Sequence, residues 1–127
     1  MTPVALIPGG YILVARKLLE SGIMEKPPLY AKMWLWMLLQ ASWKDHGKLK
    51  RGQFFTSIDR MRDAFSYRVG YRVVRPSEKE IRSAYDFLTK GGMIGTAKVT
   101  HGMIITILNY DYYQNILNYE GHTEGNY

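Results

Sequence analysis

Hydrophobic and polar positions are most regularly spaced between Ser77 and Leu108. One apolar stripe with the i, i+3, i+4, i+7 spacing of an amphipathic helix is formed by Ile81, Ala84, Tyr85 and Leu88. The opposite face then carries mainly basic and hydroxyl side chains, namely those of Lys79, Arg82, Ser83, Asp86 and Lys90. This pattern predicts a helix with one buried face and one basic face.

The ends of this helix have clear local signals. Pro76 precedes Ser77, and Glu80 completes the Ser-x-x-Glu pattern of a capping box, in which each side chain accepts a hydrogen bond from a backbone N–H group of the other residue. At the other end, Gly91 or Gly92 can adopt the left-handed conformation that closes a helix. We therefore predict a helix that starts directly after Ser77 and ends at the double glycine.

Two strands are predicted after the glycines, because apolar and polar residues alternate over 96–100 and again over 103–108. His101-Gly102 is a suitable two-residue hairpin turn between them. The segment 52–56 is rich in aromatic and β-branched residues, and we expect it to join as a third strand.

Two further helices are predicted in the first half of the chain. Ile12, Ala15, Leu18 and Leu19 have helical spacing, and Gly22 would end that helix after Ser21. The second helix runs from 29 to 43 and is apolar on almost every side, so we place it at the centre of the core with structural tryptophans.

Another helix should follow a cap at Thr56 or Ser57. Its predicted buried stripe is Ile58, Met61, Ala64 and Phe65, which turns Arg60 and Arg62 outward. The next segment, 67–76, is a near-repeat of Tyr-Arg-Val and reads as an inserted loop or small hairpin about Gly70. Its basic residues are Arg68, Arg72 and Arg75.

A basic helix followed directly by a β-hairpin is typical of a winged helix-turn-helix. The predicted fold class is α+β, with a helical core and a small three-stranded antiparallel wing sheet. A chain of 127 residues suffices for one domain of this kind. We place the domain at 1–114 and expect 115–127 to be a flexible polar tail or linker.

Charge is unevenly distributed and points to an anionic partner. The net charge is +6, yet Lys48 to Lys98 alone holds twelve Lys or Arg against five Asp or Glu. This segment also contains the basic helix and the inserted loop. Nucleic acid is the partner we favour, and the alternative is an ordinary solvated basic surface.

Catalytic and metal-binding signals are weak in this sequence. Cysteine is absent, and His46, His101 and His122 have no second ligand at metal spacing. Lys90-Gly91-Gly92 follows a predicted helix, whereas a phosphate-binding loop precedes one. We therefore expect no enzymatic activity, no cofactor and no metal.

The sequence favours the cytoplasm and no membrane association. The first residues lack the basic region of a signal peptide, and Pro8-Gly9-Gly10 interrupts the apolar stretch that follows. The longest apolar run, 33–39, has seven residues and is too short to cross a bilayer.

The predicted DNA contacts fall into three groups. Lys79, Arg82 and Ser83 lie where a recognition helix meets bases or phosphates, and Lys90 lies at its far end, nearer the backbone of the DNA. Asp86 on the same face would repel phosphate unless it pairs with Arg82 or Lys90 or meets a cytosine amino group. The remaining candidates are the loop residues Arg68, Arg72 and Arg75, the wing residues Lys98, Thr100 and His101, and Arg60.

The order of several short motifs resembles the N-terminal winged-helix domain of phage and prophage replication initiators, the replisome-organiser or DnaD-like group. The resemblance covers about 10–114 and is carried by Gly10-Tyr11-Ile12, Arg16-Lys17-Leu18, the Trp-rich helix, Lys50-Arg51-Gly52-Gln53-Phe54 with Thr56-Ser57, the segment 88–94, and Asn109-Tyr110-Asp111-Tyr112-Tyr113-Gln114. It implies DNA binding at an origin, self-association, and contacts with a replicative helicase or helicase loader. Members of the group usually carry a further C-terminal region, and the insert at 67–76 departs from their compact turn.

The same sequence features allow two other functions. A transcriptional repressor can use the same fold, because fold alone does not determine function. A protein-interaction module that binds a replication or host protein is the third reading, although the local charge excess favours DNA.

Overall fold

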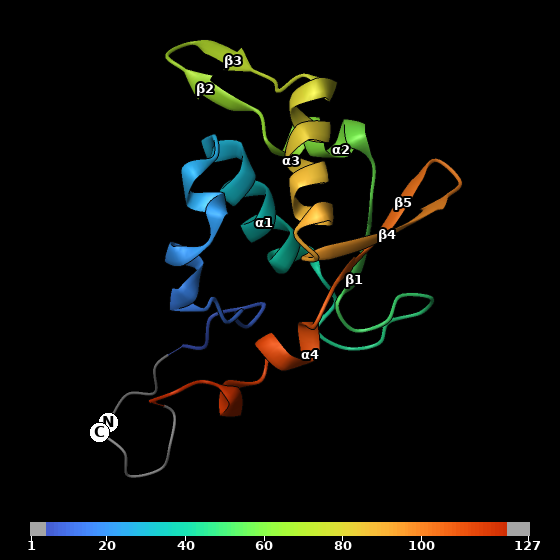
Figure 1. Ribbon diagram of the computed structural model, residues 1–127. Helices are drawn as coiled ribbons and strands as arrows, with labels where there is room; N and C mark the ends of the chain where they lie inside the picture. Colours follow the sequence, from blue (N-terminus) through green and yellow to red (C-terminus); the bar gives the residue numbers. More distant parts are fainter. Residues whose placement is uncertain (1–4, 122–127) are drawn as a thin grey trace.

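A computed structural model describes residues 5–121, which form a mixed α+β structure of short helices and antiparallel strands (Figure 1). The elements in chain order are the 3-10 turns η1 (Arg16–Glu20) and η2 (Gly22–Glu25), α1 (Pro28–Gln40), β1 (Gln53–Thr56), α2 (Ile58–Ala64), β2 (Tyr67–Val69), β3 (Arg72–Val74), α3 (Glu78–Lys90), β4 (Ile94–Val99), β5 (Gly102–Ile107), α4 (Tyr110–Tyr113) and the 3-10 turn η3 (Ile116–Asn118). Within the described residues, every helix is too short or too polar to cross a membrane.

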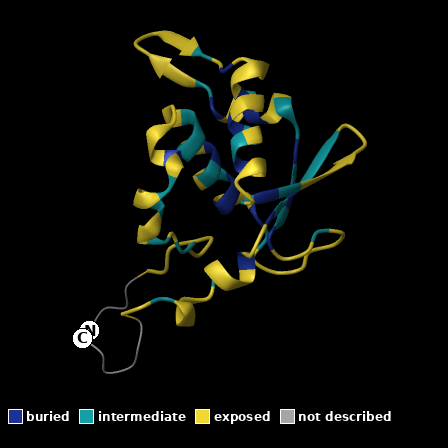
Figure 2. Ribbon diagram, in the orientation of Figure 1, coloured by how far each residue is buried: buried dark blue, intermediate teal, exposed yellow. Residues whose placement is uncertain are grey.

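The core lies where α1, α2 and α3 meet the base of the sheet, and Figure 2 shows the buried segments gathered there. Its fully buried side chains include Met33 and Met37 of α1, Met61 of α2, and Ile105 of β5. Against this core, the partly buried Trp36 ring makes edge-on contacts with Phe54 and Phe65, with ring centroids 5.6 Å and 5.1 Å apart. Such aromatic pairs link α1 to β1 and to the end of α2.

Helix α3 has the predicted ends and the predicted buried stripe. The Ser77 Oγ accepts a hydrogen bond from the Glu80 N–H group at 3.1 Å, and the Ser77 N–H group donates to Glu80 Oε1 at 3.3 Å, which completes the capping box. Ile81, Ala84 and Leu88 are fully buried. Gly92, with a φ of +72°, is the residue that takes the left-handed conformation after the helix.

The three-stranded sheet has the order β1-β5-β4 and is antiparallel throughout, so the predicted pairing of 52–56 with the hairpin is confirmed. The predicted turn at His101-Gly102 is wrong by one residue, because Val99 pairs with Gly102 and Thr100-His101 forms the turn. The strand position of Gly102 has room only for glycine. A Cβ atom there would lie 2.5 Å from the Thr56 carbonyl oxygen and 2.7 Å from the Phe55 ring.

Helix α2 begins at the predicted cap, since Ser57 Oγ accepts a hydrogen bond from the Arg60 N–H group at 3.2 Å. Two predicted orientations are wrong. Ala64, the last residue of the helix, is exposed. Arg62 bends back over the surface, where its Nε donates to the Pro76 carbonyl oxygen at 2.9 Å.

The segment 67–74 forms the predicted small hairpin, in which β2 and β3 pair with Gly70-Tyr71 as the turn. Figure 1 shows this hairpin projecting from the body beside the start of α3. Of its residues, only Val74 is partly buried, so the hairpin adds little to the core.

Helix α1 is shorter and less enclosed than predicted. It ends at Gln40, because the next residues pair with a distant segment: the Ser42 N–H group donates to the Gln53 carbonyl oxygen at 2.9 Å. Trp43 therefore lies outside the helix and is 65% exposed, which corrects its placement in the core. Leu39 is also exposed, so one side of α1 faces solvent.

The N-terminal segment does not form the predicted α-helix. The chain is extended at Ala15 and then makes only the 3-10 turns η1 and η2. The reason lies about 100 residues away, in the side-chain amide of Gln114. That amide binds both the N–H group and the carbonyl oxygen of Leu13, and a helix would have needed that carbonyl oxygen as an internal acceptor.

Helix α4 packs on the body through the buried Tyr110 ring, 5.1 Å from the Arg51 guanidinium. Burial raises the pKa of the Tyr110 phenol, and Arg51 lowers it in part. The first residues of the expected tail fold back on α4, because the Asn118 side-chain amide donates a hydrogen bond to the Tyr112 carbonyl oxygen at 2.9 Å. The rest of that tail, 122–127, lies outside the described residues.

Candidate nucleic-acid interface

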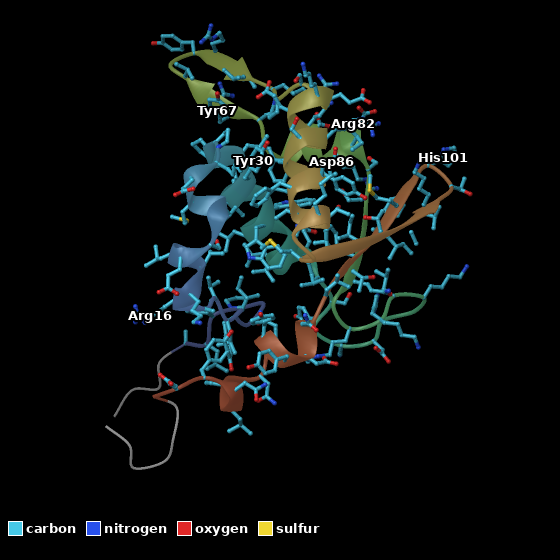
Figure 3. All side chains as sticks on the ribbon, viewed as in Figure 1. Arg16, Tyr30, Tyr67, Arg82, Asp86 and His101 are labelled. Atoms are coloured by element: carbon cyan, nitrogen blue, oxygen red, sulfur yellow. The ribbon has the colours of Figure 1, made fainter. Side chains whose placement is uncertain are left out.

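The exposed face of α3 carries the three predicted base-contacting residues. Lys79, Arg82 and Ser83 lie in the first half of the helix, and all three are exposed. The buried stripe on the opposite side holds the helix against α1 and α2, which fixes this face toward solvent. Figure 3 shows Arg82 and Asp86 on the side of α3 toward which the β4–β5 hairpin, with His101 at its tip, extends.

Acidic residues modify this face in two ways. Arg82 forms an ion pair with Glu78 one turn earlier, with Arg82 Nη2 2.8 Å from Glu78 Oε1. Asp86 has no ion-pair partner among residues 5–121, so neither of the pairings expected from the sequence, with Arg82 or with Lys90, is present. The negative charge of Asp86 is therefore uncompensated at the middle of the face.

The β2–β3 hairpin presents two of the predicted loop arginines. Arg68 and Arg72 are exposed, and neither has an acidic partner in the described part of the chain. Val69 and Val73 beside them are 51% and 55% exposed, although both are apolar. The hairpin is therefore a cationic ribbon with apolar side chains open to solvent.

Arg75, the third loop arginine, has a different position. Its Nε lies 2.8 Å from Asp63 Oδ1, so it pairs with the last turn of α2. Together with the Arg62 hydrogen bond to Pro76, this pair fastens the base of the hairpin to the body. The sequence groups Arg75 with Arg68 and Arg72 as a candidate DNA contact, and the structure separates it from them.

The wing residues Lys98, Thr100 and His101 lie at the exposed end of the β4–β5 hairpin. At the base of this hairpin, the Tyr85 hydroxyl group of α3 forms a hydrogen bond with the Thr96 hydroxyl group of β4. That contact ties the orientation of the wing to α3.

Arg60 and Lys90 lie at the margins of the same region. The Arg60 guanidinium sits 5.1 Å from the centre of the Phe55 ring, which is a cation–π contact on the surface of α2. Lys90 is exposed in the last turn of α3, next to the helix C-terminus, whose partial negative charge favours a cation there.

The charge pattern predicts Arg68 and Arg72 as DNA contacts but does not include Tyr71, which lies between them. Tyr71 occupies the turn of the β2–β3 hairpin with its side chain 102% exposed, as open as in an isolated peptide. The signal that could have found it is the Tyr-Arg repeat itself, which places an aromatic residue at the predicted turn.

The surface between the N-terminal segment and α4 is mainly apolar and not basic. A mostly apolar groove with a cavity volume of about 360 Å³ lies between the N-terminal segment, α1 and α4, and Lys17 is the one charged residue among the described residues that line it. Burial also raises the pKa of the Tyr119 phenol at its edge, helped by Tyr113 and Tyr112. Over residues 5–121, no three His, Asp or Glu side chains gather where they could hold a metal ion.

Comparison with known proteins gives no family for this chain: no family model, curated protein or solved structure matches it. The case for a function therefore rests on the arrangement of the basic helix face and the two hairpins.

Proposed function

We propose that this chain is a winged-helix DNA-binding protein without catalytic activity. The order α1-β1-α2-α3-β4-β5, with β1 added to the β4–β5 hairpin, supports this assignment. In a winged helix, α2 and α3 would be the helix-turn-helix and α3 the recognition helix. The β2–β3 hairpin is then an insert between the two helices of the motif.

The observation that carries the proposal is the exposed face of α3 between two hairpins with basic ends. Lys79, Arg82 and Ser83 project from a helix that can enter a major groove, where Arg and Lys can donate two hydrogen bonds to guanine. On either side, the two hairpins extend toward solvent (Figure 1). Their exposed cations suit the phosphates that border a groove.

The surface charge supports a nucleic acid as the ligand. The predicted cations that lack an acidic partner within 5–121 are Arg60, Arg68, Arg72, Lys79, Lys90 and Lys98. Unpaired surface cations of this kind bind phosphates and release counterions, which makes affinity fall as salt rises. A purely structural surface would have no need for such a local excess.

For the biological role, we propose replication initiation of a phage or another mobile element, in the cytoplasm. The support for this role is the motif resemblance described above. The exposed apolar residues Leu39 and Trp43, away from the basic face, offer a surface for a protein such as a replicative helicase, a helicase loader or a second copy of the chain. A repressor would use the same DNA-contacting face, without that protein partner.

A titration of labelled duplex DNA, followed by fluorescence anisotropy at several salt concentrations, tests the DNA-binding proposal. We expect saturable binding, with log K falling linearly as log salt rises. Absence of binding at low salt, or an affinity that does not depend on salt, would overturn the proposal. To separate replication from repression, the gene with its flanking DNA can be placed on a plasmid whose own origin is inactive, where autonomous replication supports the initiator role.

A further inference from the structure

The turn of the β2–β3 hairpin holds a tyrosine that the fold does not use. Val69 pairs with Arg72, which leaves Gly70 and Tyr71 as a two-residue turn, with Gly70 at a φ of +62°. The Tyr71 side chain is fully exposed, and neither its ring nor its hydroxyl group has a partner among residues 5–121. Burial therefore gives no reason for an aromatic residue at this position.

The surroundings of Tyr71 favour an anionic partner. Arg68 and Arg72 flank the turn, and no Asp or Glu occurs in the sequence from 66 to 77. The nearest carboxylate on α2, that of Asp63, is already paired with Arg75. A second copy of the same hairpin would bring four arginines together, so like-charge repulsion disfavours self-pairing through this edge.

A tyrosine at a cationic tip suits a nucleic-acid base. Aromatic side chains stack on the faces of bases, while neighbouring basic residues hold the backbone phosphates, and this combination is how single strands are bound. Inside an intact duplex both faces of each base are already stacked on neighbours. The free ring of Tyr71 therefore fits an unpaired base better than a paired one.

We propose that Tyr71 stacks on an unpaired base at a junction between single-stranded and duplex DNA, with Arg68 and Arg72 on the adjacent phosphates. This inference rests on the proposed function, since α3 holds the duplex part. The hairpin joins the body at Pro76, directly before α3, and three residues per strand carry its tip about 10 Å outward. Figure 1 shows the tip near the N-terminal end of α3 and displaced to one side of it, so the strands of the fork would separate at this end of the helix.

The test compares forked DNA, which has a duplex arm and two unpaired arms, with a blunt duplex of the same sequence. The variants are Tyr71→Ala, Tyr71→Phe, which keeps the aromatic face, and Tyr112→Ala as the control. Tyr112 is 59% exposed on α4, at the opposite end of the molecule from the hairpin (Figure 1). All are used as the full chain, and thermal melting verifies that each is folded.

We expect the wild type to bind the fork more tightly than the duplex. Tyr71→Ala should bind the fork about tenfold more weakly, because one stacking contact is lost. Its affinity for the duplex should be almost unchanged, because the duplex offers no unpaired base. Tyr71→Phe and Tyr112→Ala should retain the preference for the fork. In addition, 5-iodouracil placed at the junction should photo-crosslink to Tyr71.

The outcomes separate the two proposals. Normal duplex binding with equal affinity for the fork, or a fork preference that survives Tyr71→Ala, would overturn this inference and leave the proposed function intact. Failure of the wild type to bind either DNA would overturn both.

Discussion

The side-chain amide of Gln114 forms two hydrogen bonds with the backbone of Leu13, 101 residues earlier in the chain. The Leu13 N–H group donates to Gln114 Oε1, and Gln114 Nε2 donates to the Leu13 carbonyl oxygen, both at 2.9 Å. The amide thus replaces the partner strand that an extended backbone would otherwise need. It joins the N-terminal segment to the closing turn after α4.

Replacing Gln114 with Ala should therefore release the N-terminal segment. We expect the free energy of unfolding to fall by about 1–3 kcal/mol, because two partly buried backbone groups of Leu13 lose their partners. Urea denaturation measures that change, and the Leu13 amide should exchange its hydrogen faster. Gln40→Ala, at an exposed position in the last turn of α1, is the control and should change little. An unchanged Leu13 exchange rate in Gln114→Ala would show that the contact does not hold the segment.

Trp36→Ala should be among the most destabilising substitutions in the chain. The indole packs edge-on against Phe54 and Phe65, so its removal leaves a cavity where α1, β1 and α2 meet. We expect a loss of about 3–5 kcal/mol in the free energy of unfolding. Trp43→Ala is the matched control, because that indole is mostly exposed and its loss should cost far less. Equal melting temperatures for the two variants would contradict the assigned core.

The parts of the fold that sequence alone predicts are those specified by nearby residues. In α3, the Ser77–Glu80 capping box, the buried stripe and Gly92 all lie within one segment, and each behaves as its local pattern indicates. The sequence pattern misplaces Trp43 and Leu13, because their positions depend on residues outside their own segments. Ser42 bonds to Gln53, and Leu13 bonds to Gln114, and neither partner leaves a periodic signal.

For the candidate interface, the sequence predicts which residues lie on the exposed face but not which of them form ion pairs. Helical periodicity places Lys79, Arg82 and Ser83 on the exposed face, as the structure has them. Composition does not reveal which cations are engaged by carboxylates, and the Arg75–Asp63 pair depends on how the β2–β3 hairpin folds back on α2. A count of charges does not identify Tyr71, because it ignores aromatic residues at turns.

Asp86 should weaken DNA binding, because its carboxylate is unpaired within the described chain and lies on the same face as Lys79 and Arg82. We expect Asp86→Asn to tighten duplex binding about two- to fivefold at low salt, since two charges 4 Å apart in water repel by about 1 kcal/mol. The gain should shrink as salt increases. Anisotropy titrations measure both effects.

The control for charge is Glu20→Gln, which makes the same change on η1, away from the basic face, and should leave affinity unaltered. If Asp86→Asn binds more weakly than the wild type, Asp86 accepts a hydrogen bond from the DNA, as it would from a cytosine amino group.

A pair of charge-matched double variants tests whether the exposed face of α3 binds duplex DNA. Lys79→Ala with Arg82→Ala removes one Lys and one Arg from this face, and Arg16→Ala with Lys17→Ala removes the same two charges from η1. Figure 3 shows Arg16 at the opposite end of the molecule from Arg82. All four side chains are exposed, so both variants should melt like the wild type.

The measurement is the slope of log K against log salt for duplex binding by each variant. We expect Lys79→Ala with Arg82→Ala to bind more weakly and to have a shallower slope, because each phosphate contact that is lost lowers the slope by about 0.9. The Arg16 and Lys17 double variant should keep the wild-type slope. Equal affinities and slopes for the two variants would contradict the claim that α3 is the DNA-contacting helix.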